Sequence, residues 1–156
     1  MKNAGTIMII LLIWVAMSIT CVKEDENHHK TIQFINNYYK SIYIYCSLEY
    51  PDTLNNRLWG TQNEPQIYKV DPNTENKSAL WSRVFWETNF KNIPSDTLMV
   101  YTFDAELLEA RITHEHDAII QRYDLSLQDL QSLNWQLYYP PTVAMKDIKM
   151  WPPYEK

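Results

Sequence analysis

Glycine is almost missing from this chain, which has two glycines among 156 residues. Loops that bind nucleotides need several glycines, because their backbone must approach phosphate closely and adopt left-handed conformations. The composition therefore argues against a nucleotide-binding protein of the glycine-rich-loop type.

Positive charge is also in short supply. The chain has 14 Lys and Arg residues against 19 Asp and Glu residues, and its formal net charge is -5. An acidic domain is repelled by phosphate backbones, and no stretch of the sequence concentrates basic residues. We expect no nucleic-acid partner.

Cysteine occurs only twice, at Cys21 and Cys46. If Cys21 carries a lipid, Cys46 has no partner, and a fold held by disulfides is excluded. Stability must then come from burial, for which an apolar content of 46% is sufficient. We interpret Cys46 as a small buried apolar residue, with a reactive thiol as the alternative.

The first twenty residues have the organisation of an export signal. Lys2 is followed by the uncharged run TIMIILLIWVAMSIT at residues 6–20. This run of about fifteen residues suits the apolar region of a signal peptide, and it is short for a membrane span of roughly twenty residues. After Cys21 the sequence becomes abruptly polar.

This arrangement resembles a bacterial lipoprotein signal, in which a Cys after small residues becomes acylated. It is similar to the looser form of that signal found in Bacteroidota, where a Lys followed by acids directs lipoproteins to the outside of the outer membrane. Residues 23–26, with the sequence KEDE, fit that pattern. The resemblance implies a signal peptide at residues 1–20, lipidation of Cys21 and a charged tether at residues 21–30. An uncleaved anchor helix is the alternative.

The remaining sequence predicts one domain at residues 31–140. Alternating apolar residues predict a strand at residues 42–50, and residues 97–103 are apolar on both faces, which is typical of a central strand covered on both sides. A short strand is expected at residues 66–71 and a final strand at residues 135–139.

Helices are expected in three places. Helical spacing predicts one at residues 78–90, and Asp104 is placed to cap another that continues to about Ile120. Ser126 and Asp129 form a capping-box pattern for a third helix. The prolines after residue 139 predict a loosely attached tail at residues 141–156.

The order of these elements predicts an α+β fold: a mostly antiparallel β-sheet with two or three short helices. A β-sandwich with helical insertions is the alternative.

Several short motifs also carry a family resemblance, which covers most of the chain after Cys21. Together they resemble a group of uncharacterised small lipoproteins of gut Bacteroidota. The resemblance implies an envelope address and no particular activity. The motifs are Tyr50-Pro51-Asp52-Thr53, Asp96-Thr97-Leu98, Phe103-Asp104, Arg122-Tyr123-Asp124-Leu125-Ser126-Leu127, Asp129-Leu130, Leu133-Asn134-Trp135 and Tyr139-Pro140.

Aromatic residues supply the candidate binding site. Tyr43 and Tyr45 fall on the same face of the strand expected at residues 42–50. An exposed pair of aromatic rings can bind sugar rings or a partner protein, because flat amphipathic side chains give contact area at low entropy cost. In the alternative interpretation this face is covered and both rings belong to the core.

Charged clusters give weaker candidates. Asp96, Asp104, Glu106 and Asp124 could supply acid–base groups, but a glycosidase needs two carboxyl groups at a defined separation. The cluster at residues 114–117, with the sequence HEHD, is interpreted as a solvated helix face, because residues two apart do not share a face of a helix. We expect no metal, no cofactor and no catalytic residue.

A modification site is suggested by the same lineage. Asp52-Thr53-Leu54 and Asp96-Thr97-Leu98 resemble the O-glycosylation acceptor of that phylum, and Thr53 is the better candidate because a loop is expected around it.

The leading functional hypothesis is a lipid-anchored envelope protein, displayed on the cell surface, that binds a glycan or an envelope protein without catalysis. The alternatives are a periplasm-facing structural lipoprotein and a small hydrolase of cell-surface glycans.

Overall fold

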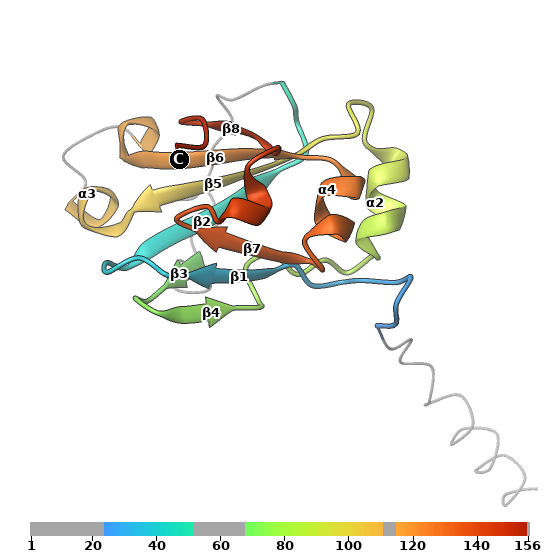
Figure 1. Cartoon of the computed structure of the whole chain (residues 1–156), viewed down its shortest axis with the longest axis horizontal. Coiled ribbons are helices and arrows are strands. Elements are labelled where there is room, and N and C mark those ends of the chain that lie inside the picture. The colour runs from blue at the N-terminus through green and yellow to red at the C-terminus, as the bar shows by residue number, and fades with distance from the viewer. Residues whose placement is uncertain (1–23, 52–67, 111–114, 156) are drawn as a thin grey trace, which may run out of the picture.

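The computed structural model describes residues 24–51, 68–110 and 115–155, and it has an α+β fold with two sheets of mostly antiparallel strands and short helices (Figure 1). The larger sheet is antiparallel throughout, in the order β3-β2-β5-β6-β8. Its strands are β2 (Ile42–Ser47), β3 (Lys69–Val70), β5 (Leu98–Asp104), β6 (Ile119–Leu125) and β8 (Lys149–Trp151).

The smaller sheet has the order β4-β1-β7. β1 (Gln33–Asn36) pairs antiparallel with β4 (Thr74–Asn76) and parallel with β7 (Gln136–Tyr139). The α-helices are α2 (Trp86–Asn92), α3 (Ala105–Ala110) and α4 (Leu127–Ser132), and two short 3-10 helices are η2 (Glu115–Ala118) and η3 (Val143–Met145). Helices α2 and α4 lie at one end of the molecule and α3 at the other (Figure 1).

β5 is the centre of the larger sheet, as its sequence predicts. Its first six residues are buried, and it pairs with β2 on one side and β6 on the other. Alternate side chains of β5 therefore enter two separate hydrophobic clusters, one on each face of the sheet.

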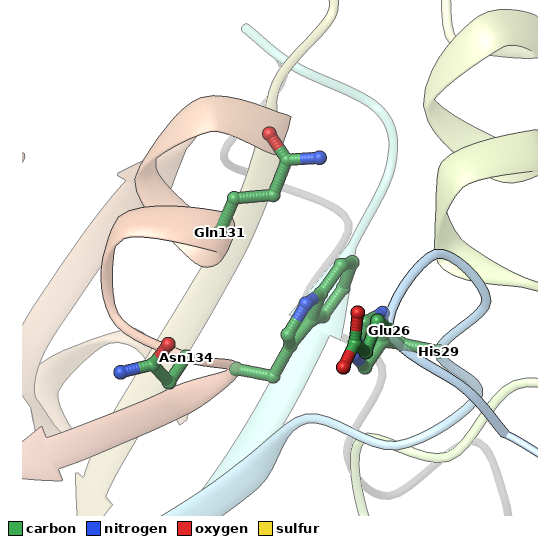
Figure 2. Close-up of a pocket in the computed structure, with 5 residues that line it drawn as sticks. Glu26, His29, Gln131 and Asn134 are labelled. Atoms are coloured by element: carbon green, nitrogen blue, oxygen red, sulfur yellow. The ribbon is translucent and has the colours of Figure 1, made fainter.

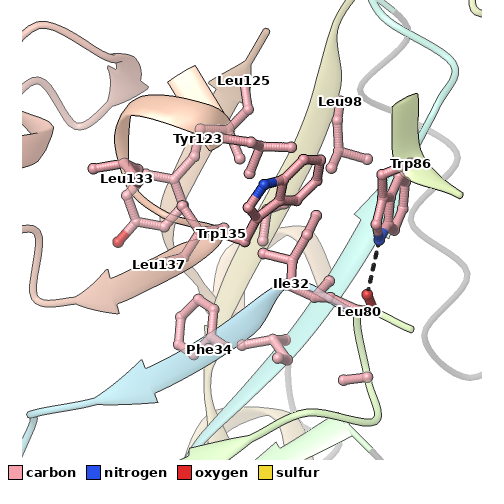
Figure 3. Close-up of a cluster of buried hydrophobic side chains, with 14 of the residues drawn as sticks. Ile32, Phe34, Leu80, Trp86, Leu98, Tyr123, Leu125, Leu133, Trp135 and Leu137 are labelled. Atoms are coloured by element: carbon pink, nitrogen blue, oxygen red, sulfur yellow. Dashed lines mark hydrogen bonds between the residues drawn. The ribbon is translucent and has the colours of Figure 1, made fainter. Parts of the chain in front are cut away.

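The main hydrophobic cluster fills the space between the larger sheet, the smaller sheet, α2 and α4 (Figure 3). In it, the Trp86 indole Nε1 donates a hydrogen bond of 3.2 Å to the Leu80 carbonyl, so a buried polar atom is satisfied. The second cluster lies on the other face of the larger sheet. Its buried members are Tyr43, Met99, Tyr101, Phe103, Ala105, Leu108 and Ala118.

The helix expected from Asp104 to about Ile120 is much shorter in the structure. Asp104 does cap it, because Asp104 Oδ1 accepts hydrogen bonds from the N–H groups of Glu106 at 2.9 Å and Leu107 at 3.1 Å. However, α3 ends at Ala110, and Ile119 begins strand β6. β6 is paired along both edges, with β5 and β8, and this non-local pairing overrides the local helical pattern.

The tail expected to be loosely attached is part of the domain, so that prediction is wrong. Met145 and Ile148 are buried in the main cluster, and β8 pairs with β6 through residues 149–151. Gln121 Nε2 also donates a hydrogen bond of 2.7 Å to the Pro152 carbonyl. The prolines end β7 without preventing the chain from returning to the larger sheet.

None of the helices in the described ranges is both long enough and apolar enough to cross a bilayer.

Candidate functional site

The segment before β1 is folded against the domain. The sequence predicts a charged, flexible tether at residues 21–30, but the described part, residues 24–30, is hydrogen-bonded within itself and to the domain. The Glu24 carboxylate accepts hydrogen bonds from the Lys30 backbone N–H at 3.0 Å and the Thr31 hydroxyl at 2.9 Å. These bonds fold the segment back on itself, so the ordered chain begins before residue 31.

His29 is one of the residues that fix this segment to the rest of the molecule. Its backbone N–H lies 3.1 and 3.0 Å from the two carboxylate oxygens of Glu87, and its ring Nδ1 lies 2.7 Å from Glu87 Oε1. The ring stacks on the Trp135 indole at 4.2 Å, with 16° between the planes. Nδ1–H donates a hydrogen bond to the carboxylate. The other ring nitrogen, Nε2, has no hydrogen-bond partner among the described residues.

Trp135 is placed by the end of α4. The N–H of Asn134 donates to Gln131 O at 3.1 Å, and the N–H of Trp135 donates to Leu130 O at 2.9 Å. These two bonds form a Schellman motif, in which Asn134 takes the left-handed position with φ 50°.

The helix cap does not require the backbone conformation of Trp135 itself, which also has a positive φ, 61°. A positive φ is a genuine outlier for a bulky residue, and such outliers concentrate at functional sites. Trp135 O accepts a hydrogen bond of 2.9 Å from the N–H of Gln33 in β1, so the conformation is held from two elements.

A shallow recess of about 430 Å³ lies beside this stacked pair (Figure 2). Figure 2 shows that Gln131 and Asn134 come from α4 and the turn that follows it, and Glu26 and His29 from the N-terminal segment; all four line the recess. A second recess of about 330 Å³ shares three of its lining residues, His29, Asn134 and Trp135. It is also lined by Glu24, Thr31, Gln33 and Lys77.

The groups around the first recess are suited to hydrogen bonding. The amides of Gln131 and Asn134 each offer donors and an acceptor, and the Glu26 carboxylate is an acceptor. The His29 ring covers one face of the Trp135 indole, which is buried. A ligand would therefore be recognised mainly by its polar groups.

The expected aromatic platform is not formed as an exposed pair. Tyr43 is only 6% exposed and belongs to the second hydrophobic cluster, where its hydroxyl donates a hydrogen bond of 3.0 Å to Glu109 Oε1. Burial is the main cause that raises the pKa of Tyr43, followed by its hydrogen bond to Glu109. Tyr45 is half-buried and packs against the same cluster. The face is covered because it is the inner side of a second core.

The candidate carboxylates take structural positions. Asp104 caps α3, and Glu106 pairs with Lys40 at 2.7 Å. Asp124 is buried, with its Oδ1 2.9 Å from Arg122 Nε and its Oδ2 3.1 Å from Arg122 Nη2. Arg122 and Asp124 meet because residues two apart share a face of a strand. Asp96, at φ 48°, lies in the turn before β5.

Cys21 and Thr53 lie outside the described residues, as does His114. His116 and Asp117 lie in η2. Across the described ranges, no group of three or more His, Cys, Asp or Glu side chains is arranged to hold a metal ion.

The sequence did not identify His29, Glu87 or Trp135 as one site. They are separated by 58 and 48 positions along the chain, and no spacing rule joins them. The polar neighbours of His29 in the sequence indicate a tether and not a contact with the domain. The only local signal was Asn134 after a helix, which is typical of a left-handed cap.

Comparison with known proteins gives no match: no family model, curated protein or solved structure corresponds to this chain.

Proposed function

We propose that this protein is exported, acylated at Cys21 and held on the outside of the outer membrane. The support comes from residues 1–26: Lys2, the apolar run at residues 6–20, Cys21, and Lys23 followed by three acidic residues. More than one acyl chain is needed for stable anchoring, and a lipoprotein Cys carries two or three.

We further propose that the folded domain binds a polar, hydroxyl-rich ligand such as a glycan segment, without catalysis, in the recess next to His29 and Trp135. The observation that carries this proposal is the strained backbone of Trp135, whose carbonyl accepts a hydrogen bond from β1. The Trp135 indole stacks on the His29 ring beside an open, polar recess. A fixed recess lowers the entropy cost of binding. Its amide and carboxylate groups match the mixed donors and acceptors of sugar hydroxyls.

Lipidation is tested by intact mass spectrometry of the protein from membrane fractions. The expected mass is that of the chain from Cys21 onward with its acyl chains, and Cys21→Ser should abolish both cleavage and acylation. An uncleaved, unmodified leader would refute the anchoring proposal. Protease treatment of intact cells then separates surface display from the periplasm-facing alternative, in which the protein is degraded only after lysis.

Ligand binding is tested by titrating the chain from Cys21 onward with envelope oligosaccharides. Gln131→Ala should weaken binding about two- to tenfold, as expected for one lost hydrogen bond. Gln128→Ala is the matched control, because Gln128 is exposed on the same helix and does not line either recess. Equal affinities of the two variants would remove the recess as the binding site.

The Glu87–His29 pair favours the hydrolase as a second candidate. A carboxylate that holds Nδ1 orients a His so that Nε2 can act as a general base. Thr31 lines the adjoining recess, but its hydroxyl donates to Glu24. Release of reducing ends from envelope glycans, lost in His29→Gln, would establish the hydrolase in place of the non-catalytic binder.

A further inference from the structure

Two apolar side chains stand exposed beside the N-terminal segment. Trp81 is 56% exposed and Val84 is 46% exposed, in the loop between β4 and α2. Phe85 follows them, half-buried, with the Lys30 ammonium 5.1 Å from its ring centroid. The loop therefore presents an aromatic and aliphatic surface flanked by a basic residue.

Backbone hydrogen bonds tie this loop directly to the N-terminal segment. The N–H of Ser82 donates to Lys30 O at 2.8 Å, and the N–H of Trp86 donates to His29 O at 2.8 Å. Thr31 and Trp81 form an antiparallel bridge. The exposed loop and the segment that leads to Cys21 thus form one surface.

Very little chain separates this surface from the anchoring residue. The side chain of Glu24 is bonded to Lys30 and Thr31, and three residue steps lead from Glu24 back to Cys21. Three extended residues reach at most about 11 Å. The polar headgroup zone is roughly 5–8 Å deep on each side of the hydrocarbon core.

We propose that Trp81 and Val84 contact the same bilayer that holds Cys21, so that the domain docks on the membrane with its α2 end. This inference rests on the proposed lipidation of Cys21. A tether this short brings the loop to the headgroup level, where Trp is favoured because its ring is amphipathic. Once the chain is anchored, contact with lipid is intramolecular, so even a weak apolar contact is populated.

The charges around the loop indicate which lipids the docking requires. Lys30 and Arg83 are basic, whereas Glu24, Asp25 and Glu26 are acidic. Because this surface has no basic excess, docking should depend on apolar contact and not on anionic lipid. It should therefore occur on phosphatidylcholine vesicles and persist in high salt.

The test uses the chain from Cys21 onward, which contains every residue of both hydrophobic clusters. A maleimide lipid is coupled to Cys21 at pH 7 in phosphatidylcholine vesicles that carry brominated acyl chains. Burial raises the pKa of the Cys46 thiol to about 11, so Cys46 does not compete for the reagent. Intact mass should show one lipid per chain. Because the lipid is attached chemically, the result does not depend on whether cells acylate Cys21.

The readout is quenching of Trp fluorescence by bromine. Trp81→Phe is compared with Trp151→Phe, a matched control, because Trp151 is 57% exposed but lies on β8. We expect the quenched component to disappear in Trp81→Phe, to remain in Trp151→Phe and to be unchanged in high salt. The proposal would be overturned if the unaltered chain and both variants were quenched equally. It would also be overturned if no quenching occurred, and the exposed loop would then be a candidate site for a protein partner instead.

Discussion

Cys46 shows how burial controls the chemistry of a single residue. It lies in β2, partly buried against the main cluster, and burial raises the pKa of its thiol to about 11. Only the thiolate reacts, so a raised pKa keeps the residue inert near neutral pH.

Thiol reactivity should therefore follow the fold. In the Cys21→Ser variant at pH 8, a thiol of pKa 11 is ionised about one part in a thousand, compared with roughly a quarter for an unperturbed thiol. The rate of reaction with a disulfide reagent should rise about tenfold per pH unit until pH reaches about 11. The same variant in guanidinium serves as the control and should level off near pH 8.5. A native rate that levels off at that lower pH would contradict the assignment.

Glu87 is a single residue that should contribute strongly to stability, because its carboxylate accepts hydrogen bonds from both the backbone and the ring N–H groups of His29. Glu87→Ala should lower the free energy of unfolding by about 1.5–3 kcal/mol, the range for hydrogen bonds to charged groups. It should also make the segment before β1 the first site of cleavage in limited proteolysis. Glu106→Ala, which removes an exposed ion pair with Lys40, should change stability by less than about 1 kcal/mol. Equal effects of the two substitutions would show that the Glu87–His29 contact is not special.

At the scale of elements, α4 is held by a complete capping box. Asp129 N–H donates to Ser126 Oγ at 3.2 Å, and Ser126 N–H donates to Asp129 Oδ2 at 2.8 Å. Ser126→Ala should cost about 1 kcal/mol in urea unfolding. Ser132→Ala is the control, because the exposed Ser132 hydroxyl bonds only to Asp129 O in the last turn, and its loss should cost less than about 0.5 kcal/mol. A cost for Ser126→Ala no larger than that of the control would remove the capping argument.

Elements with a strong local signal were predicted from the sequence. The capping box at Ser126, the cap at Asp104 and the doubly covered strand β5 are all confirmed. In each of them, neighbouring residues supply the deciding interactions or pattern.

Elements whose order comes from distant partners were not predicted. β6 was mistaken in part for helix, and β8 was not expected, because both depend on pairing across the sheet. The helix expected at residues 78–90 occurs only from Trp86, since residues 81 and 82 instead pair with the N-terminal segment. The recess was missed for the same reason: it forms where that segment meets α4 and the turn that follows it.

At the scale of the whole molecule, the sequence predicts a charged, flexible tether at residues 21–30 and a loosely attached tail at residues 141–156, and the described parts of both are bonded to the domain. The segment from Glu24 is bonded to α2 through His29 and Glu87, and the C-terminal residues contribute to the main cluster and to the larger sheet. In the sequence, only Val22 and Lys23 lie between Cys21 and this bonded segment. This is the geometric reason to expect that lipidation of Cys21 would also fix how the domain faces the membrane.

The C-terminal residues should be indispensable for folding. Ending the chain at Pro140 removes β8 and the buried side chains of Met145 and Ile148. Each buried side chain contributes about 1.5–3 kcal/mol, and β6 would be left as an unprotected edge. The total loss of about 5 kcal/mol is a large part of the 5–15 kcal/mol that stabilises a typical domain. We expect no cooperative urea transition, whereas a chain ending at Pro153 should unfold like the full chain.

A single substitution separates loss of packing from loss of chain length. Met145 is fully buried in the main cluster, so Met145→Ala should keep a cooperative transition but cost about 2–5 kcal/mol. Val143→Ala, two residues earlier and exposed, is the matched control and should cost less than about 0.5 kcal/mol. If the truncated chain unfolded at the same urea concentration as the full chain, the tail would be peripheral after all. If Met145→Ala matched its control, the core would end at β7, and the C-terminal residues would only cover the sheet edge.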